Sequence, residues 1–70
     1  MPYWVEQERK IVEAVRQAGP GGIRRRVLQQ RFPRMGAEDF NRRMKFLTKP
    51  EGQLREEPRG RQIWITLAKD

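Results

Sequence analysis

Residues 19–22 read Gly-Pro-Gly-Gly, and this run restricts the fold more than any other feature of the sequence. Glycine and proline end helices and favour turns, so a helix that begins near the N-terminus must stop before residue 19. Proline recurs at positions 33, 50 and 58 and divides the rest of the chain into short segments. With 70 residues in total, we expect one small domain that spans residues 1–70.

Three segments have the apolar spacing of amphipathic helices. They cover about residues 3–18, 24–31 and 37–49. In the third segment Phe40, Met44 and Leu47 lie on one helical face, and Pro50 closes the helix at or before Lys49. An isolated apolar residue, Ile23, precedes the second segment.

The last part of the chain, about residues 53–67, predicts a β-hairpin. Ile63, Ile65 and Leu67 alternate with other residues at the period of a strand. Residues 58–60, Pro-Arg-Gly, have the composition of a turn. The sequence therefore predicts an α+β fold with three helices and a C-terminal hairpin.

The residue types exclude most catalytic chemistry. The chain has no cysteine, histidine or serine, which excludes disulfides, Cys or His zinc sites, Ser or Cys nucleophiles and an imidazole base. We therefore expect no enzyme and no cofactor. No apolar run approaches the roughly 18 residues of a membrane span, and the N-terminus lacks a signal-peptide apolar stretch. We expect a cytoplasmic protein with no membrane partner.

Positive charge is concentrated in the middle of the sequence. Sixteen Lys and Arg residues against nine Asp and Glu residues give a net charge of +7. Residues 1–22 and 50–70 are each neutral, whereas residues 23–49 contain nine bases and only Glu38 and Asp39 as acids. Such a surplus indicates an anionic partner, with nucleic acid first and a membrane surface second. A soluble basic protein with no such partner is the alternative.

The order helix, short helix, helix, hairpin resembles the winged helix-turn-helix domain. The features that carry the resemblance are the helix from Trp4, the extended stub at Ile23, the turn at residues 32–36, the apolar face of the third helix and the hairpin at residues 54–67. Together they cover about residues 3–67. The resemblance implies that the third helix enters the major groove of DNA and that the hairpin, called the wing, touches the backbone or the minor groove.

The exposed face of the third helix supplies the first set of candidate DNA contacts. Arg42 suits guanine and Asn41 suits adenine, each through two hydrogen bonds, whereas Lys45 and Lys49 suit phosphates. Asn41 and Arg43 flank the buried stripe of this helix. The alternative is that the face is simply solvated.

Two further groups of arginines are candidate DNA contacts. Three of them, Arg24, Arg25 and Arg26, begin the second helix, where they oppose the helix dipole but suit an anion. The other two, Arg59 and Arg61, straddle Gly60 near the expected turn and suit a phosphate chain or a narrow minor groove. For the first group, the alternative is that the cluster of arginines is incidental. For the second, the alternative is a hairpin whose charges are balanced by its own ion pairs.

The sequence therefore favours double-stranded DNA as the partner of a small regulator of transcription or of a mobile element that acts by occupying its site. Part of the first helix could form a homodimer contact. The competing hypothesis is a winged-helix module that docks on an acidic protein partner, favoured by Phe46 and the neutral first helix. Binding to single strands or RNA would need stacking aromatics, and Trp64 is the ready candidate.

Overall fold

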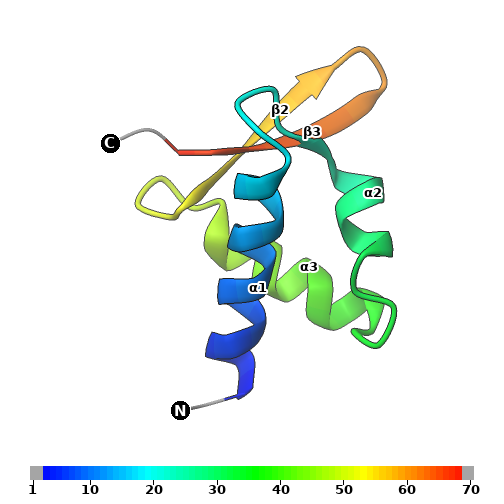
Figure 1. Cartoon of the computed structure of the whole chain (residues 1–70), viewed down its shortest axis with the longest axis vertical. Coiled ribbons are helices and arrows are strands. Elements are labelled where there is room, and N and C mark those ends of the chain that lie inside the picture. The colour runs from blue at the N-terminus through cyan, green and yellow to red at the C-terminus, as the bar shows by residue number, and fades with distance from the viewer. Residues whose placement is uncertain (1–2, 69–70) are drawn as a thin grey trace.

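The computed structural model describes residues 3–68 as a small α+β fold. Its helices are α1 (Tyr3–Gln17), α2 (Arg25–Gln30) and α3 (Ala37–Leu47), and its strands are β1 (Ile23–Arg24), β2 (Leu54–Arg59) and β3 (Gln62–Leu67). Figure 1 shows the sheet along one end of the helices, with the tip of the β2–β3 hairpin projecting beyond them. The three expected helices and the C-terminal hairpin are thus confirmed.

A single apolar core joins the helices to the sheet. Every helix and every strand contributes at least one side chain that is less than 10% exposed, as does the turn between α2 and α3. These residues are Ile11, Val12, Val15, Ile23, Leu28, Met35, Phe40, Met44, Leu47, Leu54 and Ile65. Burial of these side chains holds α3 against α1, and so fixes which face of α3 remains exposed.

The three strands form one antiparallel sheet in the order β1-β3-β2. Ile23 pairs with Ile65, so the isolated apolar residue after the glycine-rich run becomes the short edge strand β1. The other edge is β2, which contains Pro58 opposite Ile63. A proline is tolerated there because one side of an edge strand has no ladder partner for the missing N–H.

The hairpin turn lies later than the sequence predicts. Arg59 pairs with Gln62, so the turn consists of Gly60 and Arg61 rather than residues 58–60. Gly60 has φ +63°, which the first position of a type II′ turn requires and which glycine adopts without steric cost. The expected strand face is also only partly buried. Ile65 is buried, but Ile63 and Leu67 are 39% and 36% exposed because they lie toward the ends of β3.

The helices are shorter than expected. The first ends at Gln17 rather than at residue 18, and the second covers Arg25–Gln30 rather than residues 24–31. The third ends at Leu47 rather than at residue 49, because Thr48 already leaves the helical conformation and its hydroxyl donates to the Met44 carbonyl at 2.7 Å. Pro50 also disfavours helical angles at Lys49, which precedes it.

Candidate functional site

The exposed face of α3 and the residues just after it carry three of the expected contact residues. Phe40, Met44 and Leu47 face the core, and helical geometry places Arg42 and Lys45 on the opposite side. Lys49 lies two residues beyond the end of the helix and is exposed. The Arg42 side chain is 68% exposed and lies 3.9 Å from Asp39, a distance at which an exposed pair contributes little. All three cations are therefore accessible to an external anion.

An exposed aromatic ring accompanies these cations. Phe46 is 54% exposed, so it points away from the core. The Nζ atom of Lys49 lies 5.3 Å from the centre of this ring. The contact places the Lys49 ammonium group, which follows the end of α3, beside the exposed face of the helix.

Two of the residues expected to contact DNA, Arg25 and Asn41, form a hydrogen bond with each other. Arg25 donates a hydrogen bond to Oδ1 of Asn41 at 2.7 Å, and its Nε atom lies 3.7 Å from a carboxylate oxygen of Glu56. Its guanidinium group also lies 5.3 Å from the centre of the Phe40 ring. Arg25 thus links α2 to α3 and β2, which is a positioning role that the sequence did not indicate.

Arg24 and Arg59 meet on one face of the sheet. Both lie over the Trp64 ring, with their guanidinium carbons 5.8 Å and 4.7 Å from its centre. Strand register explains this arrangement. Arg24 in β1 and Glu57 in β2 are the partners of Trp64 on the two neighbouring strands. Arg59 follows Glu57 by two residues and therefore lies on the same face of the sheet. Glu57 accepts a hydrogen bond from Arg59 at 2.8 Å, so Arg59 has an internal partner. The remaining candidate of this region, Arg61, is exposed in the turn.

Arg43 lies against α1, whereas its neighbour Arg42 is exposed. Its guanidinium group lies 3.4 Å from Glu8 of α1, and both side chains are less than 20% exposed. The same group lies 5.8 Å from the centre of the Trp4 ring. Arg43 therefore holds α3 to α1.

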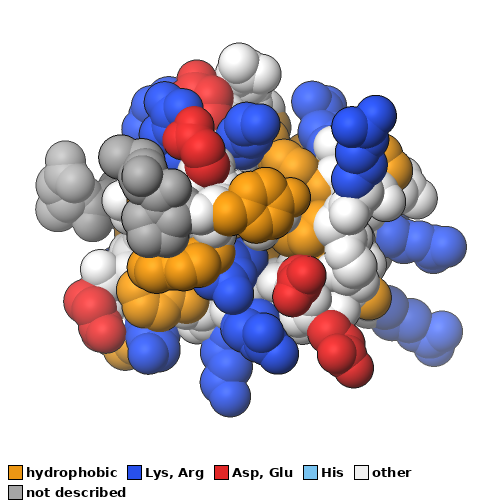
Figure 2. Space-filling view, turned by 90° about the horizontal axis from the view of Figure 1, so that it is seen from below, with side chains coloured by type: hydrophobic (Ala, Val, Ile, Leu, Met, Phe, Trp, Pro, Cys, Tyr) orange, Lys and Arg blue, Asp and Glu red, His pale blue; other side chains and the backbone are white. Residues whose placement is uncertain are grey.

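The cations of residues 23–49 fall into a paired and an unpaired group. Arg25, Arg42 and Arg43 have salt bridges. Within residues 3–68, the six others have none: Arg24, Arg26, Arg31, Arg34, Lys45 and Lys49. Arg26 is exposed on α2, and Arg31 and Arg34 are exposed beside the turn that follows it. Figure 2 shows basic side chains along several edges of the face it presents, rather than in one block.

Comparison of the chain with family models, curated proteins and solved structures finds no match. The described residues contain no cluster of His, Cys, Asp or Glu side chains that could hold a metal ion. Among the helices described, none has the length and apolar character that crossing a membrane requires. The chemistry that the exposed residues offer is the binding of anions by guanidinium and ammonium groups.

Proposed function

We propose that this chain binds duplex DNA as a small winged helix-turn-helix protein that regulates transcription or a mobile element by occupying its site. The observation that carries the proposal is the exposed face of α3, where Arg42 and Lys45 have no strong internal pairing. The Lys49 ammonium group lies beside this face, against Phe46. The element order α1-β1-α2-α3-β2-β3 supports it, because this order is typical of winged-helix domains. The charge supports it as well, since the surplus lies in residues 23–49.

The candidate residues take distinct roles in this proposal. Arg42 reads a base edge in the major groove, and Lys45 and Lys49 bind phosphates. Asn41 contacts adenine through two bonds only after its Oδ1 atom releases Arg25. Arg61, exposed in the β2–β3 turn, and Arg24 and Arg26, beside the start of α2, supply further backbone contacts.

Selection from a pool of random duplexes, followed by fluorescence anisotropy on the enriched sequence, tests the proposal. A variant with Arg42→Gln and Lys45→Gln should bind at least about tenfold more weakly, because a two-bond contact to guanine alone contributes about 1–3 kcal/mol. Selection should also lose its preference at one base position in this variant.

The matched control is Lys10→Gln with Arg34→Gln, which removes the same charge at two exposed positions outside the candidate set. This control should bind the enriched duplex within about threefold of the unchanged protein, since distant exposed charges are screened. Equal losses in the two variants, or no enrichment of any duplex, would contradict the proposal.

A further inference from the structure

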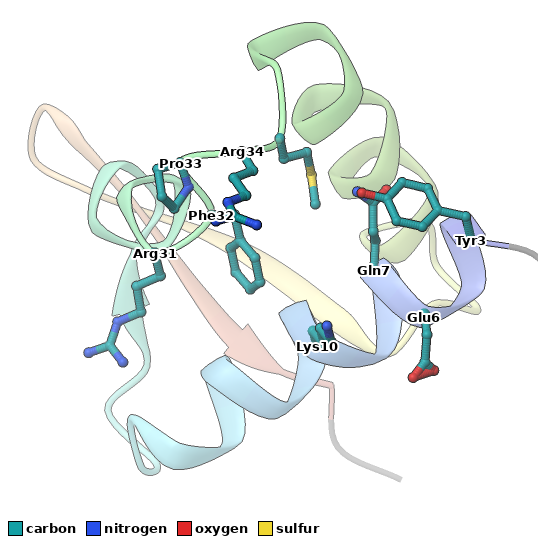
Figure 3. Close-up of a pocket in the computed structure, with 9 residues that line it drawn as sticks. Tyr3, Glu6, Gln7, Lys10, Arg31, Phe32, Pro33 and Arg34 are labelled. Atoms are coloured by element: carbon teal, nitrogen blue, oxygen red, sulfur yellow. The ribbon is translucent and has the colours of Figure 1, made fainter.

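A groove with an apolar floor lies between α1 and the turn that joins α2 to α3. It has a volume of about 420 Å³, and its apolar lining includes Tyr3, Phe32, Pro33 and Met35. Figure 3 shows Phe32 extending from the turn toward α1, and Tyr3 and Gln7 extending from α1 on the opposite side. None of these residues belongs to the proposed DNA-binding set. The groove is therefore a second surface with a different composition.

The charged residues around this groove are almost all basic. Lys10, Arg31 and Arg34 line it, and none of them has a salt bridge within residues 3–68. Figure 3 shows that Arg34 extends over the groove, whereas Arg31 points away from it. The one acidic lining residue, Glu6, points outward and accepts a hydrogen bond from Arg9. Lys10 and Arg34 thus lie on opposite sides of an apolar surface, and neither has a salt bridge among the described residues.

We propose that this groove binds an acidic peptide segment that carries a large apolar side chain. The apolar side chain enters between Tyr3 and Phe32, and flanking carboxylates pair with Lys10 and Arg34. The volume lies in the range of about 300–1,000 Å³ that is usual for binding pockets, and a buried anchor within a charged rim is the common pattern of peptide and protein interfaces.

Charge and polarity together distinguish this occupant from two others. A DNA backbone would satisfy Lys10 and Arg34 but offers no large apolar group to cover Tyr3 and Phe32. A second copy of this chain would bring another net charge of +7 to a basic surface, which is unfavourable. An acidic segment with an apolar anchor satisfies both features.

Fluorescence anisotropy with a labelled synthetic peptide tests the proposal. The peptide contains a pair of leucines flanked on both sides by glutamates. One control peptide has glutamines in place of the glutamates, and another has alanines in place of the leucines. We expect the first peptide to bind in a saturable manner and both controls to bind at least about fivefold more weakly, since each lacks one half of the recognised chemistry. Failure of the leucine–glutamate peptide to bind would overturn the proposal.

Variants of the protein locate the binding surface. Lys10→Gln with Arg34→Gln should weaken peptide binding about fivefold, because two rim pairs are lost. Tyr3→Ala should weaken it about threefold, and the fold should survive because this side chain is 75% exposed. Phe32→Leu, which keeps an apolar side chain at a half-buried position, should bind within about twofold.

A variant with Arg42→Gln and Lys45→Gln has the same net charge as the groove variant and serves as the matched control. It should bind DNA at least about tenfold more weakly but keep peptide affinity within about twofold, since its substitutions lie on α3 away from the groove. If this variant loses peptide affinity as strongly as the groove variant does, the peptide senses only overall charge and the proposal is wrong. If the groove variant loses DNA affinity at least tenfold, the groove is a phosphate contact and the proposal is also wrong.

Discussion

Arg42 and Arg43 are adjacent in α3, yet their side chains meet different surroundings. Arg42 is 68% exposed beside Asp39, whereas the largely buried Arg43 contacts Glu8 of α1. Successive helical residues are separated by about 100° around the axis, which is enough to move a side chain from solvent to a helix–helix contact. Residue type alone therefore does not distinguish an arginine that is exposed to solvent from one that holds the fold.

Arg43→Gln should lower the free energy of unfolding by about 2 kcal/mol, because it leaves the Glu8 carboxylate largely buried without its cationic partner. Urea unfolding monitored by circular dichroism measures this loss. Arg42→Gln is the matched control and should change stability by less than about 0.5 kcal/mol. Equal effects of the two substitutions would show that the Arg43–Glu8 contact does not stabilise the protein.

Gly22 is the residue whose backbone conformation most restricts substitution. It has φ +84°, and a Cβ atom there would lie 2.6 Å from the carbonyl oxygen of Ile65. Gly22→Ala should therefore destabilise the protein by at least about 2 kcal/mol, through both strain and the clash with β3. Gly21→Ala is the control, because its Cβ would meet nothing within 4 Å. Thermal unfolding should show a lower midpoint for Gly22→Ala alone, and similar midpoints would contradict the described turn.

At the scale of elements, the sequence predicts the helices and the hairpin well because their signals are local. The apolar face of α3 and the stop at residues 19–22 follow from spacing and turn chemistry. The pairing of β1 with β3 and the contact of Arg25 with Asn41 do not, because each joins residues that are distant in the sequence. The sequence places the turn at residues 58–60 instead of at Gly60 and Arg61, because proline is common in turns. Pro58 is compatible with a strand only because β2 lies at the edge of the sheet, which the sequence does not show.

Within α1, an exposed ion pair gives a measurable pH response. A hydrogen bond from Arg9 holds the pKa of the Glu6 carboxyl below its ordinary value of 4.5. Because the folded-state pKa is the lower one, the pair stabilises the protein above pH 4.5 and loses this contribution as the pH falls through the folded-state pKa. Carboxyl NMR titration should give a higher pKa for Glu6 in Arg9→Gln than in the unchanged protein. An identical Glu6 pKa in both proteins would show that Arg9 does not affect this carboxyl in solution.

For the whole molecule, the structure distributes the charge of residues 23–49 over several surfaces. Arg24 lies on the sheet, Arg34 follows α2, and Lys45 and Lys49 lie on or just beyond α3. The sequence locates the surplus along the chain but not on the surface of the folded molecule, because the relative placement of the helices and the sheet depends on contacts between residues that are distant in the sequence. A duplex contacted by α3 and the hairpin would therefore engage only part of the surplus, and the groove beside α1 retains basic residues of its own.

The salt dependence of duplex affinity tests most directly whether these cations bind phosphate. The enriched duplex should be titrated by fluorescence anisotropy across a series of salt concentrations. If about six phosphates are contacted, the logarithm of the association constant should fall against the logarithm of salt concentration with a slope near −5. Lys45→Gln should make this slope shallower by about 1. A flat salt response, or no binding of any duplex at low salt, would contradict a DNA-binding role for this protein.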